Sequence, residues 1–139
     1  MKSMKRLLSL ALVLVLFGCT ANVFDATCHV TISADPASLP AEYREILPED
    51  GVLFSGDVAI ESGEDLLGMM RRAMREEKLP LVAESGFISA IGGLAPGGAG
   101  PMSGWMFTVN GEMPMEGCDK ILLKDGDVIV WTYVTEWDG

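Results

Sequence analysis

The residues of this chain with the greatest potential for covalent or metal chemistry are three cysteines and one histidine: Cys19, Cys28, Cys118 and His29. The cysteines form no Cys-x-x-Cys motif, and one histidine cannot supply a zinc-binding cluster. No Ser/His/Asp spacing for nucleophilic catalysis is present. The many carboxylates show no pattern that brings a pair to one pocket, so a solvated acidic surface explains them. We therefore expect a protein that is not an enzyme, with no catalytic residues, no metal site and no cofactor.

The first of the three cysteines follows a segment typical of export. Lys2, Lys5 and Arg6 precede an apolar run over residues 7–17, which is too short to span a bilayer. The run ends in Leu-Phe-Gly-Cys, which resembles a bacterial lipobox with Cys19 as the lipidated residue. The resemblance implies a signal peptide over residues 1–18 and diacylglycerol attachment at Cys19, with an ordinary secretory cleavage as the alternative. Two acyl chains would anchor the protein stably to the bacterial cell membrane or envelope on its extracytoplasmic side.

The other two cysteines form an even pair in a chain that we expect to be exported. Such a pair usually forms a disulfide, so we predict a bridge between Cys28 and Cys118. The bridge would close a loop of about 90 residues and contribute about 4 kcal/mol in the chain-entropy model. A shared metal is the alternative. His29, next to Cys28, should point to the opposite face of its strand and away from such a site.

Charge excludes one class of partner. The full chain has a formal charge of −10, and removal of Lys2, Lys5 and Arg6 leaves 7 basic and 20 acidic residues, a charge near −13. Such a surface repels nucleic acid and anionic lipid headgroups. We expect no nucleic-acid partner.

One domain is predicted over residues 28–139, joined to Cys19 by a tether over residues 19–27. A helix is expected to begin at Ser62, with Ser62 as its cap and Asp65 three residues later, and to end before Pro80. Its apolar stripe should bury Leu66, Leu67, Met70, Ala73 and Met74. Strands are predicted over residues 27–33, 52–54, 57–60, 81–84, 87–91, 104–109 and 128–134, with residues 113–115 as the return arm of a hairpin. The last strand is apolar on both faces and should be central.

Aromatic residues beside a glycine-rich loop are the candidates for ligand contact. Residues 92–101 contain five glycines that let a backbone lie close to a flat ligand. The candidate binding residues follow this loop or lie in the last strand: Met102, Ser103, Gly104, Trp105, Trp131 and Tyr133. A core role is the alternative for each ring, and Trp105 shares its face with Phe107 and Val109, which favours the core for that side chain.

Three motifs together resemble the transcobalamin-like C-terminal domain family: Ser-Gly-Trp-Met-Phe-Thr-Val-Asn-Gly at 103–111, Gly-Cys at 117–118 and Leu-Lys-Asp-Gly-Asp-Val-Ile-Val-Trp-Thr-Tyr at 123–133. The similarity extends from about Cys28 to Tyr133. It implies a β-grasp-like α+β fold, with one helix packed on a mixed, mostly antiparallel sheet. It also implies a non-catalytic binding domain with cobalamin or a related corrinoid as the first candidate ligand. A surface module that binds a protein or a glycan is the alternative.

Overall fold

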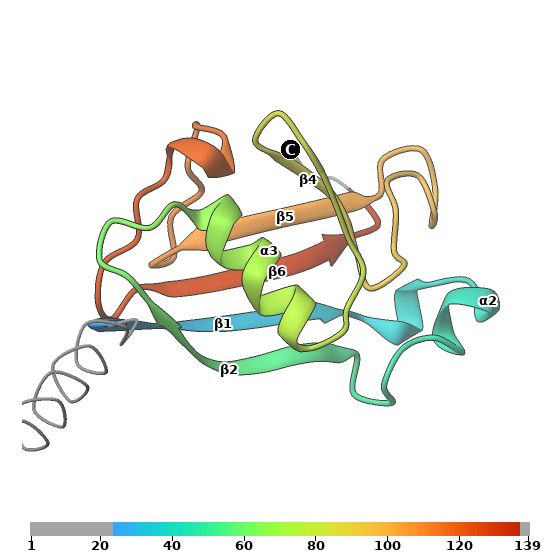
Figure 1. The fold of residues 1–139 in the computed structure, drawn as a ribbon. Helices are drawn as coiled ribbons and strands as arrows, with labels where there is room; N and C mark the ends of the chain where they lie inside the picture. Colours follow the sequence, from blue (N-terminus) through green and yellow to red (C-terminus); the bar gives the residue numbers. More distant parts are fainter. Residues whose placement is uncertain (1–23, 137–139) are drawn as a thin grey trace, which may run out of the picture.

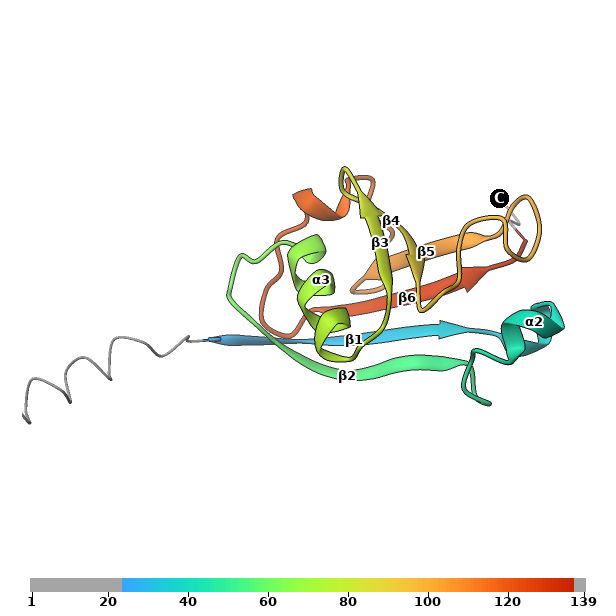
Figure 2. The same ribbon diagram turned by 45° about the vertical axis from the view of Figure 1, so that its right-hand side comes forward.

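The computed structural model describes residues 24–136, which form a four-stranded sheet covered on one face by a helix and a hairpin (Figure 1). The sheet consists of β1 (Ala26–Ala34), β2 (Val52–Ile60), β5 (Gly104–Val109) and β6 (Val128–Val134). The covering layer consists of α3 (Leu66–Glu76) and the hairpin of β3 (Leu81–Glu84) and β4 (Phe87–Ile91). Figure 2 shows helix and hairpin on the same side of the sheet. The predicted α+β class, with one main helix on a mixed sheet, is confirmed.

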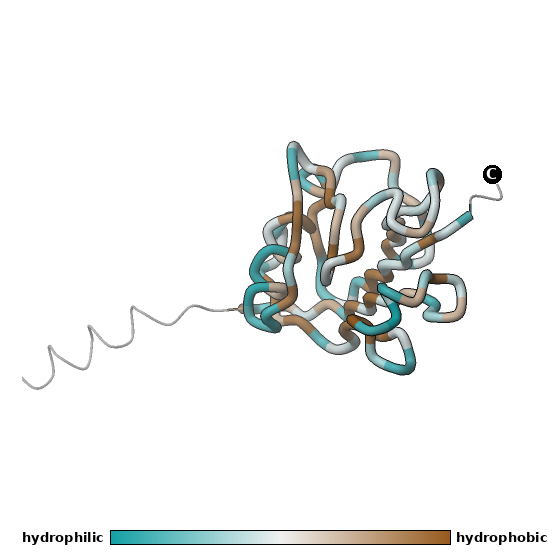
Figure 3. Tube along the Cα trace, turned by 90° about the vertical axis from the view of Figure 1, so that its right-hand side faces the viewer, coloured by the Kyte–Doolittle hydropathy of each residue, from teal (hydrophilic) through white to brown (hydrophobic). Residues whose placement is uncertain are grey.

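The strand order is β2-β1-β6-β5, so the last strand lies inside the sheet as predicted. β1 pairs antiparallel with β2 and parallel with β6, and β5 pairs antiparallel with β6. Three residues of β6 face the covered side of the sheet, in line with residues of both neighbouring strands. Ile129, Trp131 and Tyr133 lie beside buried residues of β1 and beside aromatic or apolar residues of β5. Figure 3, coloured by hydropathy, shows hydrophobic residues in the interior of the domain and mostly hydrophilic residues at the peripheral turns.

The helix begins three residues later than its first capping candidate. Asp65, not Ser62, is the N-cap, and its carboxylate accepts a hydrogen bond from the Gly68 N–H at 2.7 Å. The prediction that Ser62 caps the helix is therefore wrong. A carboxylate next to the first turn satisfies a free N–H and meets the positive end of the helix dipole, which gives Asp65 the advantage.

One arginine of α3, Arg72, ties the helix to the sheet. Its guanidinium forms an ion pair with Glu64 at 2.9 Å and donates to the Ala59 carbonyl at 2.8 Å. It also lies 4.8 Å from the ring centroid of Phe24. The long apolar stem lets the charged group reach the strand while its carbons cover apolar surface.

Residues 113–115 form no strand, so the predicted return arm is wrong. The Asn110-Gly111 turn is present, since the Val109 N–H donates to the Glu112 carbonyl at 2.8 Å. However, the Asn110 N–H donates to the Val128 carbonyl, and the Asn110 side-chain oxygen accepts from the Val128 N–H, each at 2.8 Å. Asn110 is thereby bound to the start of β6. The chain then leaves the sheet in a loop over residues 110–127, which contains the short 3-10 helix η2 (Cys118–Lys120).

The opposite face of the sheet has no covering layer within residues 24–136. It carries alternating residues of the four strands, among them Thr31 in β1, Thr108 in β5 and the half-exposed Val128 in β6. His29 and Asp57 form an exposed pair there, with 2.9 Å between Nδ1 and the carboxylate oxygen. The candidate aromatic rings all lie on the covered face.

Candidate ligand-binding site

The two ends of β5 surround the candidate aromatic residues in different ways. At its start lies the glycine-rich loop, near α2 (Ala41–Arg44); at its end lies the loop of residues 110–127 with η2 (Figure 1). Between them, Phe107 stacks on Trp131 with 4.7 Å between ring centroids. Trp105 meets Tyr133 edge to face at 5.3 Å. These pairs follow from the register, which sets Phe107 opposite Trp131 and Trp105 opposite Tyr133.

The glycine-rich loop is held against the core by side chains that were candidates for ligand contact. The Trp105 indole N–H donates to the Leu94 carbonyl at 2.9 Å, and the Tyr133 hydroxyl donates to the Ala95 carbonyl at 2.6 Å. Trp105 is only 8% exposed, in line with the core role that its alternation favoured. The polar groups of both rings are therefore used inside the fold.

Ser103 and Gly98 complete this closed end. The Ser103 hydroxyl accepts from the Ala99 N–H at 3.0 Å and donates to the Gly100 carbonyl at 2.7 Å. A Cβ at Gly98 would lie 2.9 Å from the Tyr43 hydroxyl and 3.1 Å from that of Tyr133. Glycine at 98 thus allows close packing of the loop on two tyrosines.

The two remaining candidate contacts near the glycine-rich loop are Met102 and Gly104. Met102 is 58% exposed, and Gly104 is half-buried with no atom within 4 Å of where a Cβ would lie. Neither residue lines the cavity found in the middle of the covered face. Their role in ligand contact stays a prediction.

A cavity of about 90 Å³ lies between the hairpin, the sheet and the loop of residues 110–127. Its floor is formed by three aromatic rings of the sheet, and its walls by the start of β4 and the residues before η2. The residues that line it are Gly86, Phe87, Ile88, Trp105, Phe107, Glu116, Gly117, Cys118 and Trp131. Sequence reasoning named two of these as ligand contacts, Trp105 and Trp131.

The hairpin turn and the loop are joined directly at the cavity wall. The Cys118 N–H donates to the Gly86 carbonyl at 2.8 Å. Gly86 has φ of +81°, and a Cβ there would collide with the Asp119 carboxylate. A glycine at this turn is what allows the loop to close onto the hairpin.

Trp131 is the cavity residue with an unsatisfied polar group. The side chain is 1% exposed, and its indole N–H has no hydrogen-bond partner within residues 24–136. A buried donor without a partner costs about 1–3 kcal/mol relative to a satisfied one. Because such groups are rare and Trp131 lines the cavity, a ligand atom that accepts a hydrogen bond would gain from reaching it.

Exposed apolar side chains lie on the segments beside the cavity: Phe87 lines it, and Met115 directly precedes Glu116, which also lines it. A second, shallow hollow of about 460 Å³ adjoins it, with Glu116 common to both. Phe87, Met113, Met115 and Leu122, which we call the apolar end, are 63%, 53%, 99% and 62% exposed. None of these four residues is among the candidate contacts named from the sequence. The signal was present in Met113-Pro114-Met115, since proline disfavours a paired strand and leaves both methionines without a buried face.

The predicted disulfide is not formed in the structure, where Cys28 and Cys118 are free, buried thiols. Cys28 lies in β1 opposite Val58 of β2, whereas Cys118 begins η2 beside the hairpin turn. The two side chains thus pack against different neighbours. Burial raises the pKa of each thiol to about 11, with the Asp127 carboxylate adding to the shift at Cys28 and Asp119 at Cys118. Both are neutral at physiological pH.

The proposed lipidation residue, Cys19, lies outside the described residues, as does the signal segment. No helix within residues 24–136 is long and apolar enough to cross a membrane. Over the same residues, no group of three or more His, Cys, Asp or Glu side chains is placed to hold a metal ion.

Residues 63–135 match a family described as a domain of unknown function, DUF4430. The match covers 73 of the 139 residues, more than half of the chain. The chain belongs to the DUF4430 family. The matched segment of this DUF4430 protein includes α3, the hairpin, β5, β6 and every residue that lines the cavity. No curated protein matches the sequence.

The solved structures that are similar to this DUF4430 protein include the following two. Haptocorrin in complex with Cbi aligns over 83% of this chain at 15% identity with a TM-score of 0.54. The alignment covers 26% of the haptocorrin chain, so the DUF4430 protein spans about a quarter of that protein. A proposed metal-binding protein from Ruminococcus gnavus ATCC 29149 aligns over 81% of this chain and 100% of its own, at 15% identity and a TM-score of 0.49. At this identity the haptocorrin match shows a shared fold.

Proposed function

We propose that this DUF4430 protein is a non-catalytic binding domain whose ligand contacts the aromatic cavity and the apolar end. The observation that carries the proposal is the indole N–H of Trp131, which has no partner among the described residues and belongs to a side chain that lines a cavity beside exposed apolar residues. Small-molecule sites are typically apolar and aromatic, with a few polar groups that orient the ligand. The ligand would be largely apolar and would carry one group that accepts a hydrogen bond.

The size of the cavity limits how such a ligand binds. At about 90 Å³ it is far below the range of roughly 300–1,000 Å³ for drug-sized ligands. A large ligand would therefore lie across the apolar end and place only one substituent in the cavity. The two exposed methionines suit this role because their flexible, polarizable side chains adapt to a ligand surface.

Cobalamin or a related corrinoid is the first candidate ligand. Two observations support it: the motifs of residues 103–133 resemble transcobalamin-like C-terminal domains, and the fold resembles a quarter of haptocorrin, whose solved complex contains Cbi. We infer that the DUF4430 domain and the corresponding part of haptocorrin are related. A flat, largely apolar face with amide groups at its edge fits the apolar end and the free Trp131 donor.

A protein or glycan at the cell surface is the second candidate. Met115 is 99% exposed and lies beside other exposed apolar residues, and such patches on a soluble domain are typical of interaction sites. This alternative needs no ligand group in the cavity, so it predicts binding that is insensitive to changes at Trp131.

Titration of the full-length chain with cobinamide and with cobalamin, followed by tryptophan fluorescence, tests the proposal. We expect saturable binding that is weakened at least fivefold by Met115→Ala. Met102→Ala is the matched control, since it removes an equally flexible exposed methionine at the other end of β5. A loss of affinity in the control but not in Met115→Ala would move the site to the glycine-rich loop. No binding of either corrinoid would exclude this ligand class.

We also propose that the protein is an extracytoplasmic lipoprotein anchored through Cys19. The basic start, the apolar run and the Leu-Phe-Gly-Cys ending support this proposal. Cys19→Ala should release the protein from the membrane fraction and abolish incorporation of labelled fatty acid. Cys28→Ala should change neither. Continued sedimentation of Cys19→Ala with membranes, without fatty-acid incorporation in the wild type, would contradict lipid anchoring.

A further inference from the structure

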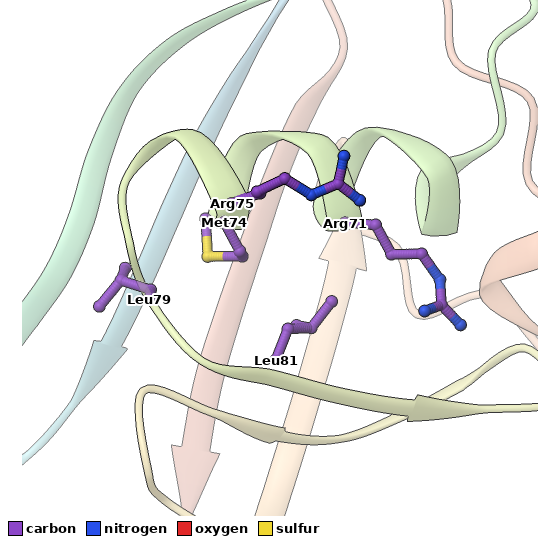
Figure 4. A pocket seen from close by; sticks show the side chains of 5 residues that line it. All are labelled: Arg71, Met74, Arg75, Leu79 and Leu81. Atoms are coloured by element: carbon purple, nitrogen blue, oxygen red, sulfur yellow. The ribbon is translucent and has the colours of Figure 1, made fainter.

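A separate groove lies on the opposite flank of α3 from Arg72, between the helix and β3. It has a volume of about 200 Å³ and is lined by Arg71, Met74, Arg75, Leu79 and Leu81. None of these residues lines the aromatic cavity. Figure 4 shows the side chains of Met74, Leu79 and Leu81 between helix and strand, with the two arginines along the helix beside them.

Arg71 and Arg75 differ from Arg72 in having no partner. Arg72 is bound to Glu64, whereas neither of the other two forms an ion pair or a hydrogen bond with any residue in 24–136. Both are exposed and lie one turn apart on the same helix. Figure 4 shows both guanidinium groups extending toward the N-terminal end of α3.

Unpaired arginines at this spacing are unfavourable on their own. Like charges four residues apart on a helix repel each other by a few tenths of a kcal/mol. The chain carries 20 acidic residues, yet no carboxylate lines this hollow. Glu76, the last residue of α3, and Glu77, its C-cap, line another hollow with Arg72 on the side of β2. The flank that faces β3 is therefore cationic in an otherwise acidic protein.

We propose that the groove between α3 and β3 binds a small amphiphilic anion. Arg71 and Arg75 would hold its carboxylate or phosphate group, and Met74, Leu79 and Leu81 would contact its hydrocarbon part. Guanidinium groups suit this role because their planar donors match carboxylate and phosphate oxygens in pairs. The volume, below that of drug-sized pockets, favours a compact ligand over a folded partner.

The probes that test this groove are octanoate and octyl phosphate, added to the full-length chain labelled for backbone amide NMR. Acetate has the charge without the hydrocarbon, and octan-1-ol has the hydrocarbon without the charge. We expect octanoate or octyl phosphate to shift amide signals of α3 and β3 in a saturable way. Acetate and octan-1-ol should bind at least tenfold more weakly. Equal binding of octan-1-ol would overturn the proposal, because the arginines would then contribute nothing.

Charge variants locate the site. Arg71→Gln with Arg75→Gln should weaken binding at least tenfold, and Arg71→Lys with Arg75→Lys should retain part of the affinity. Lys120→Gln with Lys124→Gln removes the same charge elsewhere and should leave binding unchanged. All four side chains are exposed, and a thermal melt checks that each variant folds. An equal loss in both Gln pairs would overturn the site in favour of a general charge effect.

Other occupants give different signals. Vesicles with anionic phospholipid that perturb α3 and β3, while octanoate leaves them unchanged, would overturn the small ligand in favour of a membrane surface. Signals of α3 and β3 that shift on dilution of the protein alone would overturn it in favour of a second copy of the chain. Absence of any shift up to 10 mM probe, a weak-binding limit of about −3 kcal/mol, would also overturn it.

Discussion

The two ends of β5 use similar aromatic residues for different purposes. At the glycine-rich end, Trp105 and Tyr133 donate their polar hydrogens to loop carbonyls, so the rings fasten the loop to the sheet. Toward the other end, the Trp131 indole N–H is buried and has no partner in the part of the chain that the structure describes, and the loop beside it carries exposed methionines. The difference shows that glycine density alone does not indicate a binding loop. The useful indicator is whether the polar atoms of nearby rings already have partners.

The largest expected effect comes from removing a ring at the closed end. Trp105→Ala should lower the free energy of unfolding by about 3–5 kcal/mol, because it leaves a cavity and removes the hydrogen bond to the Leu94 carbonyl. Chemical denaturation measures the change. An unfolding free energy within 0.5 kcal/mol of the wild type, a size typical of surface substitutions, would show that Trp105 is not part of the core.

Thiol reactivity distinguishes Cys118, which lines the cavity, from Cys28, which does not. Because burial raises the pKa of both thiols from 9.0 to about 11, the thiolate fraction at pH 8 falls about a hundredfold on folding. Alkylation by iodoacetamide should therefore be at least a hundredfold slower in the folded protein than in denaturant. Cys118 should react before Cys28, since only Cys118 lines the cavity.

The same pKa shift has a defined sign for stability. A thiol whose pKa is raised by folding contributes stability that is complete below pH 9.0 and is lost as the pH rises toward 11. Cys28→Ala should therefore flatten part of the fall in unfolding free energy between these pH values. Peptide mapping that finds no free thiol before reduction would contradict both expectations.

A smaller effect on stability is expected from adding a methyl group to the glycine-rich loop. Gly98→Ala should cost about 1–3 kcal/mol, because the new methyl group would press on the Tyr43 and Tyr133 hydroxyls. Gly104→Ala is the matched control, with no atom within 4 Å of its added Cβ. Equal melting temperatures for both variants would mean that the loop is not held against the tyrosines.

The smallest effect on stability is expected at the apolar end. Met115→Ala should change the unfolding free energy by less than about 0.5 kcal/mol, since the side chain is 99% exposed. Any loss of ligand affinity in this variant would then be assignable to a lost contact. A destabilisation above 1 kcal/mol, which surface changes rarely cause, would place Met115 in an interface within the fold.

Alternation and turn residues predicted most of the fold. The strands β3 and β4 begin and end at the predicted residues, and the apolar run of residues 128–134 is central as predicted. Only one face of this strand is buried, however, because Val128 and Thr132 lie on the uncovered face of the sheet. The helix start was misplaced because Ser62 and Asp65 are both good caps. The segment between them is held by Leu123, whose carbonyl accepts from the Gly63 N–H and whose N–H donates to the Glu64 carbonyl. Local sequence cannot show such a contact.

The candidate site was predictable only in part, for a similar reason. Alternation placed Trp105 and Trp131 on single faces of their strands, but it could not show which indole N–H would find a carbonyl. That outcome depends on where Leu94 and the hairpin turn lie, both distant in sequence from Trp131. The exposed methionines lie in an irregular loop, where no periodic pattern exists to predict exposure.

The parallel pairing of β1 with β6 determines when this domain can fold. Val30 lies beside Ile129, 99 residues later in the chain, and the β1–β6 pair is the middle of the sheet. Contacts of such long sequence separation form slowly, because a large loop must close before any of them is gained. A ribosome must complete nearly all of the chain before the central pair can assemble. For a protein that we expect to cross a membrane, this order of events keeps the chain unfolded, and therefore threadable, until it has been made.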